Sequence, residues 1–186
     1  MKSPASGEKS REKKAPSVSR SALEGAALRY LERFDCTTSK LKKVLDERVR
    51  KAARAGDEAA SAAPAIIAEL LERYQSSGLI DDRRFAQNFA RSQRERGASK
   101  RMIEQKLRMR GVPTELASEA LVTPDSRASE LEAARAFARR RRLGPHRKPE
   151  TRDAFRQKDL MALARAGFDY DTASRVVGNS SSEDEF

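Results

Sequence analysis

Few residues of this chain could carry out covalent or metal chemistry. Its 186 residues include one histidine, His146, and one cysteine, Cys36. His146 lies in a basic, proline-containing loop and lacks the partners that a general base or a metal site needs. Cys36 shares no motif with a histidine, so we interpret it as a packing residue. The isolated glycines form no phosphate-binding loop. The sequence therefore predicts a protein that is not an enzyme and that has no metal or cofactor.

Two adjacent carboxylates, Asp81 and Asp82, are the remaining candidates for catalysis or metal binding. They follow the apolar pair Leu79 and Ile80, where a new helix is expected to begin. Neighbouring side chains at a helix start point apart, and the free amide groups there attract negative charge. We therefore interpret both residues as helix-capping groups.

Positive charge is the strongest chemical signal. Lys and Arg outnumber Asp and Glu by 39 to 28, the net charge is +11 and the pI is about 10.1, which favours a polyanionic partner such as nucleic acid. Residues 81–110 hold ten basic against four acidic residues, a net +6, and residues 127–165 hold twelve against five, a net +7. The alternative is a scatter of solvated arginines. We predict one solvent-facing basic surface made of Arg91, Arg94, Arg96, Lys100, Arg101, Arg108, Arg139, Arg140, Arg141, Arg142, Arg147 and Lys148.

The elements that must position these residues are helices. Ala, Leu, Arg, Glu and Lys dominate the sequence, while the few Val and Ile seldom alternate with polar residues, so the pattern predicts an all-α fold without a sheet. About nine helices are expected, at roughly 22–34, after Thr37–Ser39, 64–78, 82–95, 99–110, 113–121, from 125 to the stop at Gly144, 152–166 and 169–177.

An internal repeat groups these helices. Leu107, Gly111, Val112 and Ala117 match residues 163, 167, 168 and 173 at a constant offset of 56, although two alanine-rich helical hairpins can also match by chance. Three helices occurring three times predict an elongated row of tandem units. The predicted division is a disordered basic tail (1–20), a first unit (21–78) with an insertion (50–63), a second unit (79–122), a third unit (123–178) and an acidic tail (179–186).

The residues at the helix ends of this row resemble those of a known family. The run Gly78–Ala86, followed by Arg96-Gly97 and Leu107–Val112, resembles the RecX family of bacterial regulators of the RecA recombinase. The segment from Arg156-Gln157-Lys158 through Gly167-Phe168 is similar to the closing segment of that family. The resemblance covers roughly residues 21–178, and the departures are the 50–63 insertion and the basic N-terminal tail.

The resemblance implies a curved row of three-helix units that lies in the groove of the RecA–DNA filament. It also implies that the protein restrains filament growth, ATP hydrolysis and strand exchange, as part of homologous recombination, DNA repair and the SOS response. We expect a monomer that binds single- and double-stranded DNA weakly and without sequence preference. The alternative is a stand-alone helical DNA-binding protein or transcriptional regulator, with the helix at 113–121 as its reading helix. No apolar run is long enough to span a membrane, and the single cysteine fits a reducing cytoplasm.

Overall fold

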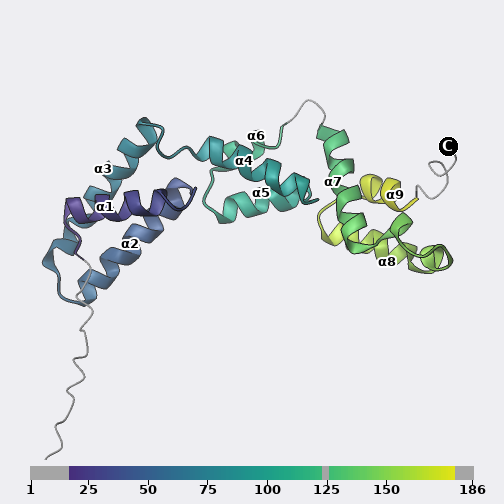
Figure 1. Cartoon of the computed structure of the whole chain (residues 1–186), viewed down its shortest axis with the longest axis horizontal. Coiled ribbons are helices and arrows are strands. Elements are labelled where there is room, and N and C mark those ends of the chain that lie inside the picture. Colours follow the sequence, from purple (N-terminus) through teal and green to yellow (C-terminus); the bar gives the residue numbers. More distant parts are fainter. Residues whose placement is uncertain (1–16, 123–125, 179–186) are drawn as a thin grey trace, which may run out of the picture.

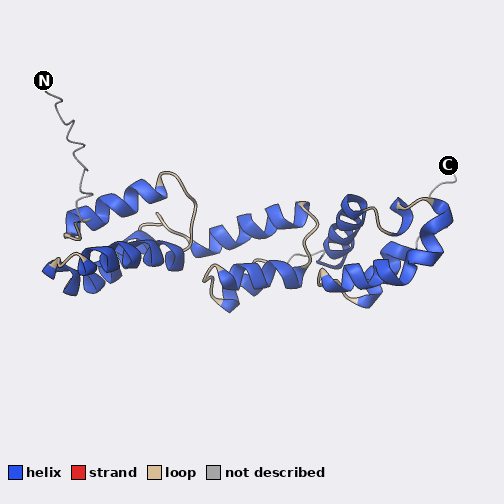
Figure 2. Ribbon diagram, turned by 90° about the horizontal axis from the view of Figure 1, so that it is seen from below, coloured by secondary structure: helices blue, strands red, loops and turns tan. Residues whose placement is uncertain are grey.

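The computed structural model of the chain describes residues 17–122 and 126–178, where all regular secondary structure is helical (Figure 2). The predicted all-α fold without a sheet is confirmed across these ranges. Three short 3-10 turns lie at Glu58–Ser61, Gly144–His146 and Pro149–Thr151. The nine α-helices of the described residues are α1 (Arg20–Leu31), α2 (Thr38–Arg54), α3 (Ala63–Ser76), α4 (Asp82–Glu95), α5 (Lys100–Met109), α6 (Thr114–Glu119), α7 (Ser126–Arg141), α8 (Arg152–Arg165) and α9 (Tyr170–Gly178).

The helices form an elongated, arched row of three groups (Figure 1). Each group has its own apolar core, and we name the groups by these cores. The first unit is α1–α3, with a core that includes Leu23, Leu41 and Leu70. The second is α4–α6, built around Ile103 and Leu107, and the third is α7–α9, built around residues such as Leu163 and Phe168. Because each core is small, neighbouring units stabilise one another through the contacts between them.

The first unit differs from the sequence prediction at two places. Residues 50–54 complete α2 and do not begin an insertion, and both Ala52 and Ala63 are fully buried. Most of the predicted N-terminal tail, residues 1–16, lies outside the described residues, as does the acidic tail 179–186. Within residues 17–20, however, Val18 is fully buried and the Ser17 carbonyl accepts a hydrogen bond from Arg48 at 2.9 Å. The first unit therefore begins before residue 21.

A polar joint connects the first unit to the second. The Thr37 hydroxyl, which also caps α2, donates to the carbonyl of Arg110 at the end of α5 over 2.7 Å. The Thr38 N–H donates to the carboxylate of Asp82 in the first turn of α4 over 2.8 Å. Asp81 caps α4 as predicted, by accepting from the Arg84 N–H, whereas Asp82 reaches across to the neighbouring unit. These bonds satisfy amide and carbonyl groups that helix ends leave unpaired.

The same joint recurs between the second unit and the third. The Ser99 hydroxyl caps α5 and donates to the carbonyl of Ala166, at the end of α8, over 2.6 Å. The Lys100 N–H donates to the carboxylate of Glu130 on α7 over 3.1 Å. In this joint Ser99 makes the hydroxyl–carbonyl bond that Thr37 makes in the first joint. Glu130 accepts the backbone N–H, as Asp82 does there.

The recurring joint gives the internal repeat a physical cause. Gly111 and Gly167, the repeated glycines, lie against Ser39 and Ser99 of the preceding unit. A Cβ atom added to Gly167 would come within 2.6 Å of the Ser99 hydroxyl, and one added to Gly111 would collide with the side chain of Ser39. The repeated sequence is therefore that of a docking surface, since a larger residue at either position would push two units apart.

Candidate nucleic-acid interface

The corner between α4 and α5 brings the two predicted basic clusters together. Gly97 turns the chain with φ +73°, and a Cβ atom there would lie 2.7 Å from the backbone nitrogen of Phe137 in α7. The corner is therefore packed directly against the third unit. Across this contact the guanidinium of Arg140 donates to the Arg96 carbonyl over 2.7 Å. Residues more than forty positions apart in the sequence thus become neighbours.

Most of the predicted basic residues are exposed around this junction. Their exposure follows from the helix geometry, because the buried faces of α4 and α5 are occupied by small or apolar residues such as Ala86, Ala90, Ile103 and Leu107. Arg108 makes a distant ion pair with Glu104 at 3.8 Å, one helical turn away. No ion pair or hydrogen bond within the described part of the chain engages the side chains of Arg91, Arg96, Lys100, Arg101, Arg139, Arg142 and Lys148.

Two adjacent arginines at the end of α7 are partly held by an aromatic ring. The guanidinium carbons of Arg140 and Arg141 lie 5.8 and 5.9 Å from the ring centroid of Phe137. Both side chains remain exposed, and a cation over a ring at an exposed site gains only about 0.5–1 kcal/mol. This contact orients the charges without removing them from water.

Arg94 is a correction to the predicted surface. Its guanidinium pairs with the carboxylate of Glu130, and the two side chains are only 15% and 12% exposed. Because the same carboxylate accepts the Lys100 N–H of the joint, Arg94 helps to fasten the second unit to the third. The prediction that Arg94 faces solvent is therefore wrong. The sequence pattern did not reveal this, because Glu130 lies 36 residues away on another helix.

Arg147 is the second correction. It makes two hydrogen bonds of 2.7 Å to the carboxylate of Asp159, which is 1% exposed and also accepts the Gly144 N–H at 2.8 Å. Burial alone would raise the pKa of the Asp159 carboxyl, but the bonds from Arg147 and Gly144 outweigh it and hold that pKa below its usual value. Arg147 also lies over the ring of Phe155 at 4.5 Å. It therefore shapes the loop between α7 and α8.

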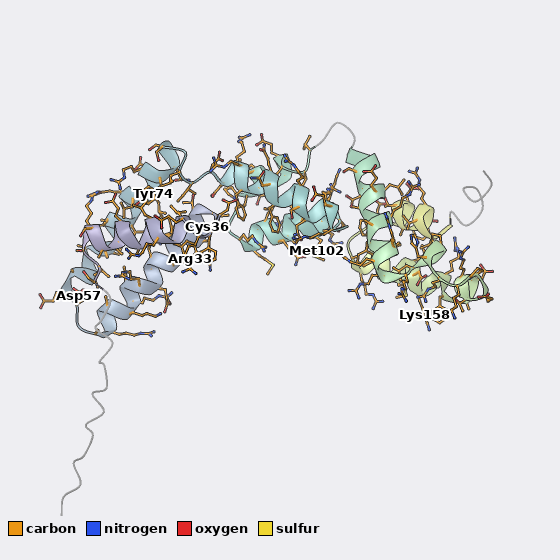
Figure 3. All side chains as sticks on the ribbon, viewed as in Figure 1. Arg33, Cys36, Asp57, Tyr74, Met102 and Lys158 are labelled. Atoms are coloured by element: carbon orange, nitrogen blue, oxygen red, sulfur yellow. The ribbon has the colours of Figure 1, made fainter. Side chains whose placement is uncertain are left out.

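The residues considered for other chemistry do not form a site. His146 is exposed on the turn after α7, and no group of His, Cys, Asp or Glu in the described residues could hold a metal ion. Burial, with the nearby charges of Asp35 and Asp82, raises the pKa of the Cys36 thiol to about 11. Cys36 lies at the corner between α1 and α2 (Figure 3) and is buried there, as expected for a packing residue. None of the described helices is both long and apolar enough to cross a bilayer.

The sequence prediction also missed a group of cations. Both basic clusters that it identified lie after residue 81. It did not identify α2, which carries seven Lys and Arg residues against two acids. Their spacing of three to four positions along one helix was the signal that could have identified them.

An arched row of three-helix units with exposed basic residues at one junction defines a class of helical-repeat protein. Comparison with known proteins narrows this class. The family model described as "RecX, second three-helix domain" matches residues 81–121. The Regulatory protein RecX of Myxococcus xanthus is 41% identical over 169 residues, which cover 90% of each chain. That of Halorhodospira halophila is 35% identical over 164 residues, or 88% of this chain and 91% of the relative.

A solved structure agrees with this result at the level of the fold. The crystal structure of RecX from Lactobacillus salivarius superimposes with a TM-score of 0.64 at 20% identity, covering 87% of this chain and 96% of the other. The chain therefore belongs to the RecX family of regulatory proteins, as its resemblance implied.

Proposed function

We propose that this chain is a non-enzymatic regulator that binds in the groove of the RecA–DNA filament and inhibits ATP hydrolysis, filament extension and strand exchange by RecA. Membership of the RecX family supports a regulatory role. The observation that carries the proposal is the meeting of two basic clusters at the junction of the second and third units, where Arg140 reaches the Arg96 carbonyl.

The electrostatics of the junction fit a groove lined by phosphates and acidic protein surfaces. The exposed arginines around α4, α5 and the end of α7 lie in water, so each contributes little to the stability of the fold and remains free to meet an anion. A concentrated positive surface speeds association with a polyanion and fixes its register more than it selects a base sequence. Filament binding needs these properties, because the groove repeats along any DNA sequence.

The arch itself supports the proposal. The two polar joints fix each unit against the next through backbone groups of α2, α5 and α8, so the row has a set curvature (Figure 1). A curved, stiff row can follow a helical groove and touch several neighbouring protomers. Such binding restrains the changes between protomers that filament growth and ATP hydrolysis require.

The alternative of a stand-alone transcriptional regulator is less well supported. Its candidate reading helix, α6, has six residues, carries Glu115 and Glu119 and contains no Lys or Arg. Glu119 moreover pairs with Arg83 of α4. A major-groove reader needs hydrogen-bond donors and positive charge on such a helix.

We also propose that the protein acts as a monomer. The joint is directional, and the first unit lacks the docking surface that would accept another unit. Aligning Thr37 with Ser99 places Arg48 and Val49 where the second unit has Arg110 and Gly111, but α2 continues through these positions to Arg54. The row therefore ends at the first unit, as capped repeat proteins do.

Titration of RecA ATPase on single-stranded DNA tests the proposal. The parent should suppress hydrolysis, and the variant R91E/R96E/R101E/R139E should not, although its helical melt stays close to the parent's because exposed substitutions cost about 0.5 kcal/mol or less each. The variant R29E/R33E/R84E/R175E is the control, because it makes the same charge change at exposed residues away from the junction. A parent that leaves ATPase unchanged would refute the function, and a junction variant that folds and inhibits like the parent would refute the basic surface.

A further inference from the structure

The first unit has a basic surface of its own, which lies on α2. A shallow hollow of about 600 Å³ runs along this helix. It is lined by Lys40, Lys43, Val44, Glu47, Arg48, Arg50 and Lys51. These residues recur every three to four positions and therefore share one face of the helix, beside the stripe of the buried Leu41 and Leu45. We call this face the α2 surface.

The α2 surface keeps its lysines available, whereas Arg48 donates to the Ser17 carbonyl and Arg50 pairs with Glu47. Lys40 and Lys43 have no ion pair or hydrogen bond through their side chains within the residues that the structure describes, and both are exposed. Glu47, the only acid of the surface, pairs with Arg50 at 2.7 Å and reaches Lys51 only at 3.9 Å. Five cations against one carboxylate leave a net charge of +4 on one helical face.

The dimensions of the α2 surface fit a phosphate backbone. Lys40 and Lys51 are eleven residues apart, which is about 16 Å along a helix. Over that length one strand of B-DNA presents about five phosphates. The positive charges thus form a line, as a linear polyanion requires, and the open shape of the hollow does not enclose a small ligand.

The composition of the surface argues against other partners. It has no aromatic side chain on which a base could stack, so contact is limited to the backbone and independent of sequence. Its only apolar lining residue is the half-buried Val44, which leaves nothing to insert into a lipid layer.

We propose that the α2 surface is a separate binding site for the phosphate backbone of nucleic acid. It belongs to the first unit, whereas the loop between α7 and α8 lies at the opposite end of the arch (Figure 1). The protein would then hold free DNA at one end while the junction of the second and third units remains available. This site goes beyond the proposed function, because it acts on bare nucleic acid without RecA.

Fluorescence anisotropy with a labelled oligo(dT) strand tests the proposal, using the variant K40Q/K43Q/K51Q of the full chain. Loss of three phosphate contacts should weaken binding by at least about tenfold at low salt. It should also make the slope of log affinity against log salt shallower by about 2, since each contact to a single strand contributes about 0.7. The control R29Q/R84Q/R175Q removes the same charge from exposed positions elsewhere and should stay close to the parent.

Three results would overturn the proposal. One is an affinity and salt slope of the triple variant equal to those of the parent. Another is an equal loss in the control, which would indicate a general charge effect. The third is normal oligonucleotide binding together with lost inhibition of RecA, which would assign the surface to an acidic protein partner. Loss of DNA binding while saturating protein still inhibits RecA ATPase would support the proposal and leave the proposed function intact.

Discussion

A cycle of substitutions at Ser99 and Gly167 should reveal the joint between the second and third units as an energetic coupling. Gly167 has φ +90°, and a Cβ atom there would lie 2.6 Å from the Ser99 hydroxyl. That hydroxyl is fixed, because it donates to the Ala166 carbonyl at 2.6 Å and accepts from the Met102 N–H at 3.3 Å. An alanine at 167 can be accommodated only if the hydroxyl turns away and gives up both bonds.

The expected free energies follow from this geometry. Ser99→Ala loses a helix cap, worth about 1 kcal/mol, and leaves the partly buried carbonyl of Ala166 unpaired, which costs about 1 kcal/mol more. Gly167→Ala costs about 1 kcal/mol for the left-handed backbone and loses the same two hydrogen bonds of Ser99, worth about 2 kcal/mol. Its total cost is therefore about 3 kcal/mol. The double variant should again cost about 3 kcal/mol and not about 5, because the bonds can be lost only once. The coupling free energy is therefore about 2 kcal/mol.

Urea denaturation followed by far-ultraviolet circular dichroism measures these values. Gly78→Ala is the matched control, since Gly78 has φ +71° but a Cβ atom there would meet nothing within 4 Å. It should cost only the backbone contribution, about 1 kcal/mol. Additive effects in the double variant, or a Gly167→Ala variant no less stable than Gly78→Ala, would refute the joint.

Two further predictions concern the arginines that proved to be structural. Arg94→Ala should cost about 3 kcal/mol of unfolding free energy, because it leaves the buried carboxylate of Glu130 without its cation. Arg91→Ala, on the exposed side of the same helix, should cost about 0.5 kcal/mol or less. Equal losses for the two variants in urea denaturation would contradict the assignment of Arg94 as a structural residue. Asp159→Asn should destabilise the protein at neutral pH, and the difference in unfolding free energy from the parent should shrink below about pH 4. A carboxyl whose pKa is lowered in the folded state stabilises the fold above its unfolded pKa. That contribution is lost as the pH falls through the folded pKa. A difference between the two proteins that stays constant down to acidic pH would show that Asp159 is not held ionised by Arg147.

The sequence predicted the local structure well because the signals for helix ends act within a few residues. Asp81 caps α4 and Ser99 caps α5, and the chain turns with positive φ at Gly97 and Gly111, where stops were expected. The first helix was displaced by two to three residues at its ends, since it begins at Arg20 and ends at Leu31. Capping and helix propensity are local interactions, so a single sequence is enough to place them.

The repeat could be recognised from the sequence, but its meaning could not. The pattern around Gly111 and Gly167 indicated two similar helix ends. Only the structure shows that these ends receive Ser39 and Ser99 of the preceding unit. At residues 50–54 the sequence was misleading. Their weak periodicity suggested an insertion, yet they complete α2 and bury Ala52.

The sequence by itself determined the fold class, the stops and caps around α4 and α5 and the surplus of positive charge, all of which depend on residue types and short-range spacing. The tertiary structure decided which cations are available. Arg91 and Arg94 lie on one helix, yet only Arg94 meets Glu130, and only Arg147 in its loop meets Asp159. A cation is buried when another helix brings a carboxylate to it, and that encounter depends on how the units pack and not on neighbouring residues.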